Sequence, residues 1–201
     1  MNASPGPLPP RYALVLHPQD PTARPPSPQG LVDALMAVGL AGPELPCPDG
    51  PRLLPGPRFL ELLTFLGCSP YVEVVPPAGV ADPCEALARF CHLRVEAFAA
   101  EPSLRRSRQG PTPRCPQCRA PVEGDLTNLA AAVRAGATWT CPRCGGASPA
   151  RGLDWRQSAG VGRAFLEVWG IHPGEAVPSD ELLAAISRVT GGPWRWFYEQ
   201  S

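Results

Sequence analysis

Two short cysteine motifs decide how this chain is divided. The first is "PTPRCPQCRAPV" (residues 111–122) and the second is "TWTCPRCGGAS" (residues 138–148). Each holds a Cys-Pro-x-Cys knuckle, and 22 residues separate the two knuckles. A two-residue gap lets both sulfurs of one turn face a single ion, so two knuckles supply the four donors of a tetrahedral metal. The predicted ligands of one metal ion are Cys115, Cys118, Cys141 and Cys144.

Residues 114–147 resemble a zinc ribbon in their CPxC and CPxCG knuckles. The resemblance covers about one-sixth of the chain and implies one structural zinc ion. Gly145 directly follows the second knuckle and suits a tight turn, whereas a helix predicted between Asp125 and Gly136 departs from a plain three-stranded ribbon. Iron in a rubredoxin-like site is the alternative metal. Four thiolates leave no open position on either ion, so the predicted site is structural rather than hydrolytic.

Outside the knuckles, apolar patterns predict an α+β fold, or α/β, with one layered sheet–helix core. Helices are predicted at 27–39, 57–67 and 179–191, the last with Leu182, Ile186 and Val189 on its buried face. A short helical turn is predicted after Asp82. Strands are predicted at 11–18, 71–75, 90–98, 153–157, 163–171 and 194–200. In the strand at 90–98, His92, Arg94 and Glu96 are predicted on the more exposed face, and "GVGRAF" (160–165) is predicted to be a turn.

The same patterns divide the chain into three parts. Residues 1–10 are rich in proline and predict an extended tail. Residues 11–111 and 148–201 together predict the α+β core. Residues 112–147 predict a zinc-ribbon-like insertion, and residues 100–113 before it have the composition of a linker.

Charge is distributed unevenly although the formal net charge is zero. All 18 basic residues are arginine, so a Schiff-base lysine and a phosphate-loop lysine are both excluded. Residues 101–163 hold ten arginines against four acidic residues, and the segments on both sides are acidic. Arginines of this segment are candidate contacts for nucleic acid or a protein partner. They are Arg105, Arg106, Arg108, Arg114, Arg119, Arg134, Arg143 and Arg151.

The four remaining cysteines are predicted to be free, buried thiols, because reduced cysteine packs as a small apolar residue. They are Cys47, Cys68, Cys84 and Cys91. Cys68 lies where a predicted helix ends, which makes it the candidate reactive thiol. A histidine could serve as its base, but no local motif supports a Cys68–His pair, and His17 and His172 each precede a proline that can end a strand.

Three classes of function follow, in decreasing order of support. The first is a non-enzymatic zinc-binding adaptor that docks a protein partner, since no HExxH, GxSxG or Walker motif is found. The second is nucleic-acid binding through the Arg-rich segment, and the third is a thiol-dependent enzyme using Cys68. A composition rich in Ala, Pro, Gly and Arg is typical of a GC-rich bacterial genome. We expect a cytoplasmic protein, because the sequence shows neither a signal peptide nor an apolar run long enough for a membrane span.

Overall fold

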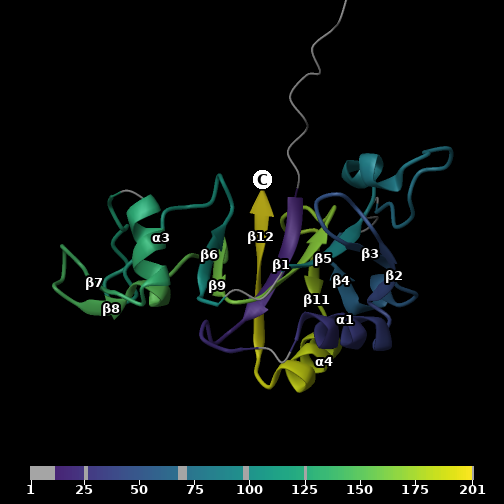
Figure 1. Cartoon of the computed structure of the whole chain (residues 1–201). Coiled ribbons are helices and arrows are strands. Elements are labelled where there is room, and N and C mark those ends of the chain that lie inside the picture. The colour runs from purple at the N-terminus through teal and green to yellow at the C-terminus, as the bar shows by residue number, and fades with distance from the viewer. Residues whose placement is uncertain (1–11, 25–26, 68–71, 97–99, 125, 201) are drawn as a thin grey trace, which may run out of the picture.

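The main feature of the computed structural model is a six-stranded antiparallel sheet (Figure 1). The structure describes residues 12–24, 27–67, 72–96, 100–124 and 126–200. In spatial order the sheet consists of β12 (Trp194–Gln200), β1 (Tyr12–Pro18), β10 (Phe165–Trp169), β5 (His92–Glu96), β3 (Arg52–Pro55) and β2 (Ala41–Leu45). Every neighbouring pair is antiparallel, which confirms the α+β class and is unlike the parallel sheet of an α/β fold.

Helices α1 (Pro28–Ala37) and α4 (Asp180–Thr190) pack on one face of this sheet. Both begin where the sequence predicts, because the side chains of Ser27 and Ser179 accept hydrogen bonds from backbone N–H groups in the first helical turns. The main core joins apolar residues of both helices to the strands beneath them. It includes Leu14, Leu16, Leu31, Leu35, Leu93, Leu166, Val168, Leu182 and Ile186.

The opposite face of the sheet is contacted by a separate two-stranded ladder, formed by β6 (Ser103–Arg106) and β9 (Ala159–Gly162). Side chains alternate along a strand, so Ala13 and Val15 of β1 lie on this face, opposite the side chains that face the helices. Both faces of β1 are therefore buried. Phe165 and Phe197 complete the cluster beneath the ladder.

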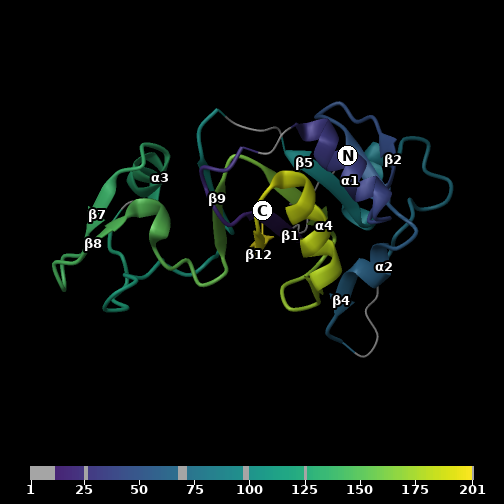
Figure 2. The same ribbon diagram turned by 90° about the horizontal axis from the view of Figure 1, so that it is seen from below.

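A lobe containing the cysteine knuckles lies beyond this ladder, to one side of the sheet in both views (Figures 1 and 2). It contains α3 (Leu126–Arg134), the hairpin of β7 (Thr138–Thr140) and β8 (Ala147–Pro149), and the short 3₁₀ helix η2 (Ala150–Gly152). The predicted helix between the knuckles is thereby confirmed. The lobe has a small core of its own, which extends onto the ladder at Val161. Its members are Val122, Leu129, Val133, Ala150, Leu153, Trp155 and Val161.

The predicted division at residues 112 and 147 stays a prediction. Three residues of the lobe core, Ala150, Leu153 and Trp155, follow residue 147 in the sequence. A deletion that leaves the sheet intact should therefore extend further toward the C-terminus than residue 147.

The periphery departs from the predicted helices and strands at several places. The helix predicted at 57–67 is short, because α2 (Phe59–Leu62) gives way to β4 (Leu63–Phe65), which pairs with β11 (Ala176–Pro178). The turn predicted after Asp82 is the 3₁₀ helix η1 (Pro83–Arg89).

Other expectations are wrong. Residues 72–75 and 153–157 form no strand, and Tyr71 lies outside the described residues. The predicted linker contains β6, and the predicted turn at 160–165 contains the end of β9 and the first residue of β10. Val189 is 38% exposed rather than part of the buried helix face. No helix among the described residues combines the length and the apolar character needed to cross a membrane.

Candidate metal centre

The two knuckles have the same backbone structure. In the first, the N–H of Arg119 donates to Cys115 O (3.0 Å) and the N–H of Cys115 donates to Ala120 O (2.8 Å). In the second, Gly145 donates to Cys141 O (2.9 Å) and Cys141 donates to Gly146 O (2.9 Å). The proline after each first cysteine suits such a turn, because its ring fixes φ.

Each knuckle also has a left-handed residue at the same position. Arg119 has φ 63° and Gly145 has φ 69°. Glycine adopts this conformation without strain, whereas an arginine there costs about 1–2 kcal/mol. Arg119 also makes an ion pair with Asp154, so its side chain helps to hold the first knuckle against the segment that follows the β7–β8 hairpin.

Both knuckles are positioned by β-structure. The second is the loop of the β7–β8 hairpin, since Thr140 pairs with Ala147 directly beside it. The first is closed by Arg114, which forms bridges with Pro121 and Asp154. Short backbone ladders therefore fix the positions of both cysteine pairs.

The four cysteine sulfurs lie within 4.8 Å of one another. Cys115 Sγ is 3.9 Å from Cys144 Sγ, and Cys118 Sγ is 3.7 Å from Cys141 Sγ. A tetrahedral ion with metal–sulfur distances of about 2.3 Å requires sulfur–sulfur distances of about 3.8 Å. Two of the sulfur–sulfur distances thus match a tetrahedral ion, and all four predicted cysteines lie close enough together to hold a metal ion.

The thiols of this cluster differ in acidity. Backbone N–H groups, that of Cys144 foremost, lower the pKa of Cys141 to about 7. The backbone N–H of Gly146 lowers the pKa of Cys144, but partial desolvation and hydrogen bonds with the three neighbouring thiols together outweigh it and raise that pKa to about 11. Four adjacent sulfurs cannot all be thiolates without a cation between them. A bound metal ion supplies that positive charge and displaces the remaining protons.

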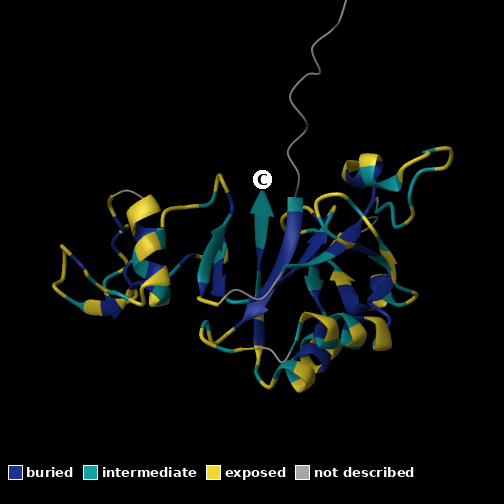
Figure 3. Ribbon diagram, in the orientation of Figure 1, coloured by how far each residue is buried: buried dark blue, intermediate teal, exposed yellow. Residues whose placement is uncertain are grey.

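The arginines of the Arg-rich segment differ in exposure. Arg108, Arg119, Arg134 and Arg143 are exposed, and Arg106, Arg114 and Arg151 are half-buried. Helix α3, which bears Arg134, is largely exposed in Figure 3.

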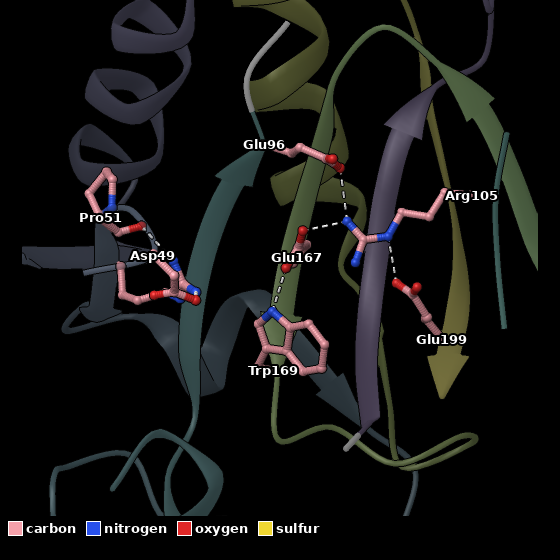
Figure 4. Close-up of polar contacts among 8 residues, drawn as sticks. Asp49, Pro51, Glu96, Arg105, Glu167, Trp169 and Glu199 are labelled. Carbon is pink, nitrogen blue, oxygen red and sulfur yellow. Dashed lines mark hydrogen bonds and ion pairs between the residues drawn. The ribbon is translucent and has the colours of Figure 1, made fainter. Parts of the chain in front are cut away.

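The structure does not support Arg105 as a contact for nucleic acid or a partner, because its side chain points into the protein (Figure 4). Its guanidinium bonds to Glu96 (2.9 Å), Glu199 (2.6 Å) and Glu167, which is fully buried. The three carboxylates come from three different strands of the sheet. Arg105 also lies 5.9 Å from the centre of the Phe165 ring. It therefore joins β6 to the sheet and is unavailable to nucleic acid.

The acidic partners outnumber the arginine in this cluster. Burial raises the pKa of Glu199, and the positive charge of Arg105 partly opposes this rise. The negative charges of Glu167 and Glu96 raise the pKa further. Glu167 also accepts a hydrogen bond from the indole N–H of Trp169. Sequence reasoning missed the cluster, although a glutamate within the apolar strand "FLEVW" (165–169) indicates that a cation covers it.

The other cysteines differ from the predicted set of free thiols. Cys47 and Cys84 form a disulfide, which the sequence could not reveal because cysteine spacing alone does not determine pairing. Cys91 is buried and free as predicted, and burial raises its pKa to about 12. Cys68 lies outside the described residues.

The three histidines lie in different surroundings. His17 is buried between Phe165 and Phe197, and burial lowers its pKa. His92 was predicted on an exposed face but is only 1% exposed, because it stacks on Trp169. His172 is exposed and its ring contacts Tyr12.

Comparison with known proteins assigns no family to this chain. No family model, no curated protein and no solved structure matches the chain. The four-cysteine cluster is therefore the main guide to function.

Proposed function

We propose that this protein is a non-enzymatic binding protein whose lobe is stabilised by one structural zinc ion. The observation that carries the proposal is the convergence of four cysteine sulfurs at tetrahedral spacing. Four thiolates complete the coordination of zinc and leave no position for water or substrate. The ion would then stabilise the fold of the lobe rather than act on a substrate.

Zinc is preferred to iron because it forms tetrahedral thiolate sites without redox chemistry. The likeness to zinc ribbons in the knuckles supports the same choice. Either metal would be held by the same residues.

The position of the lobe supports a role in binding a protein partner. It lies to one side of the sheet, where a partner can reach it (Figures 1 and 2). A groove of about 550 Å³ runs between the start of β6 and α3. Its lining mixes apolar side chains with one charge of each sign, which suits a protein segment. The lining includes Glu101, Pro102, Leu104, Ala130 and Arg134.

Nucleic-acid binding by the lobe is the second candidate. The exposed guanidinium groups of Arg108, Arg134 and Arg143 favour it, since phosphate contacts require accessible cations. The inward position of Arg105 argues against it. Replacement of these three exposed arginines by glutamine tests it. A steep fall of oligonucleotide affinity with salt, flattened in the variant, would establish this second function.

We place the function in the bacterial cytosol, where thiolate ligands remain reduced. The Cys47–Cys84 disulfide favours an oxidising compartment instead. Mass spectrometry of alkylated protein from cells would decide between the two compartments.

Elemental analysis of protein purified without added metal tests the zinc proposal. We expect one zinc per chain, and its loss in Cys141→Ser. The matched control is Cys91→Ala, which removes a buried thiol of the main core and should retain the zinc. A red iron–thiolate spectrum, or equal zinc in the two variants, would contradict the proposal.

The binding role needs its own experiment. Substitutions of Leu104 and Ala130 by glutamate would place charges in the groove. We expect them to abolish capture of a protein partner by cross-linking while the zinc content stays at one per chain. Capture that is unaffected by both substitutions would exclude this groove as the docking surface.

A further inference from the structure

A second concave site lies on the side of the sheet that faces β9. It is a cleft of about 370 Å³, formed where the end of β1, the loop at 151–157, β9 and β12 meet. Figure 1 shows β9 between the lobe and β12. None of the side chains in the cleft is a predicted metal ligand. Its lining includes His17, Gln19, Arg151, Trp155, Arg156 and Arg195.

The cleft has a net positive charge, because three arginines and one acidic residue, Asp154, line it. No ion pair links Arg151, Arg156 or Arg195 to an acidic residue within the described ranges. Unpaired cations gathered at one cleft favour an anionic ligand.

The acidic residues nearby are engaged elsewhere. Asp154 pairs with Arg119 and accepts the backbone N–H of Arg156 (2.9 Å). Asp20, which lies in the field of Arg151, accepts hydrogen bonds from the backbone and side chain of Thr22, each at 2.8 Å. Among the described residues, neither carboxylate forms an ion pair with a guanidinium group of the cleft.

His17 forms an uncharged part of the wall. Burial lowers its pKa, and the positive charge of Arg195 lowers it further. Its Nδ1 lies 2.9 Å from Pro18 O, so the ring is held in place by the protein itself. His17 thus shapes the cleft, and the arginines supply its charge.

Trp155 provides an independent indication of a missing acceptor. It is 7% exposed and lines the cleft, yet its indole N–H has no hydrogen-bond partner among the described residues. An indole nitrogen can only donate, and a buried donor without an acceptor is rare in native structures. The next two residues, Arg156 (φ 52°) and Gln157 (φ 57°), are both left-handed. Such a conformation is costly for residues other than glycine and is found disproportionately at binding sites.

We propose that this cleft binds a small phosphorylated molecule, with its phosphate held by Arg151, Arg156 and Arg195. Phosphate oxygens accept charge-assisted hydrogen bonds from guanidinium groups in bidentate geometry. The indole nitrogen of Trp155 has almost no exposed surface, so it donates to the ligand only if this side chain shifts on binding. The volume is at the lower end of the range for small-molecule sites, so a molecule larger than phosphate alone fits. A polynucleotide is less suited, because the cleft has only the volume of a small-molecule site.

Calorimetric titration of the full chain with inorganic pyrophosphate at constant ionic strength tests the proposal. Arg151→Gln/Arg195→Gln is the main variant, and it should fold because Arg195 is exposed and Arg151 half-buried. Arg188→Gln on α4 is the matched control, since this exposed arginine belongs to a helix on the other face of the sheet. We expect the double variant to bind pyrophosphate at least about tenfold more weakly than the wild type, and the control to bind it normally.

A second variant tests the indole. Trp155→Phe keeps an aromatic ring and removes only the N–H donor, so it should weaken pyrophosphate binding several-fold. Thermal unfolding of each free variant shows that the comparison is made between folded proteins. Equal affinity in the wild type and in Trp155→Phe would exclude the indole from the site.

Three results would overturn the proposal as a whole. One is the absence of pyrophosphate binding to the wild type at roughly 150 mM salt, where surface charges are largely screened. Another is an equal loss of affinity in Arg188→Gln. The third is binding of a short single-stranded oligonucleotide but not of pyrophosphate, which would assign the cleft to nucleic acid. None of these results bears on the zinc content.

Discussion

Arg105 connects three strands of the sheet to the ladder that leads to the lobe. Its guanidinium is 18% exposed and bonds to carboxylates of β5, β10 and β12. Removing one partner of a buried ion pair leaves the other charge without compensation, which is more costly than the pair is stabilising. Glu167 would be that charge, because its side chain has no exposed surface.

Arg105→Met should therefore lower the free energy of unfolding by about 3–5 kcal/mol. Arg106→Met on the same strand is the control, and we expect a change within about 0.5 kcal/mol, because Arg106 bonds only to the neighbouring Ser107 O among the described contacts. Urea unfolding followed by circular dichroism measures both. Similar losses in the two variants would show that Glu167 finds other compensation.

At the scale of elements, β9 is in close contact with the sheet because of a glycine. A Cβ at Gly160 would lie 2.5 Å from His17 Cδ2 and 2.7 Å from Phe197 Cε1. Both rings are held in the cluster between the ladder and the sheet. A Cβ at Gly162 would meet Pro18 Cδ at 3.4 Å, which is an ordinary contact.

Gly160→Ala should lower the free energy of unfolding by about 1–3 kcal/mol through overpacking, whereas Gly162→Ala should be tolerated. Neither glycine has a positive φ, so the backbone accepts alanine at both positions. Thermal unfolding of the two variants side by side measures the difference. If Gly162→Ala were the more destabilised variant, the contact of β9 with His17 and Phe197 would be looser than described.

Elements with a local signal could be predicted from the sequence. Helices α1 and α4 each have a capping serine and an apolar face, and β1, β10 and β12 are apolar runs. The ladder of β6 and β9 could not be predicted. β6 is rich in arginine and β9 in glycine, and each is a strand only because the other pairs with it.

The candidate site shows the same contrast. The cluster of four cysteines was predictable because each pair lies within one turn, and the geometry of such a turn depends on residues close together in the sequence. The partners of Arg105 and the Cys47–Cys84 disulfide join segments far apart in sequence. The basic cleft also draws on three segments far apart in the sequence, which only the fold brings together.

At the scale of the whole molecule, the main core and the lobe core share no residue. The ladder of β6 and β9 connects them, with Val161 in the lobe core and Arg105 bonded to the sheet. The lobe core is small, and a core of this size rarely folds without a metal or disulfide. The sheet has an extensive core with helices on one face, and none of the four clustered cysteines belongs to that core.

Removal of the metal by a chelator should therefore unfold the lobe and leave the sheet folded. Metal binding and folding of such a site are one equilibrium, with apparent binding energies of about 10–16 kcal/mol in small zinc domains. Hydrogen exchange should show amides of α3, β7 and β8 losing protection, while those of β1, β10 and β12 keep it. Cys141→Ser should reproduce this pattern without chelator, and Cys91→Ala should not. Loss of protection in β1 at the same chelator concentration would mean that lobe and sheet unfold as one unit, with the Arg105 cluster as the connection that couples them.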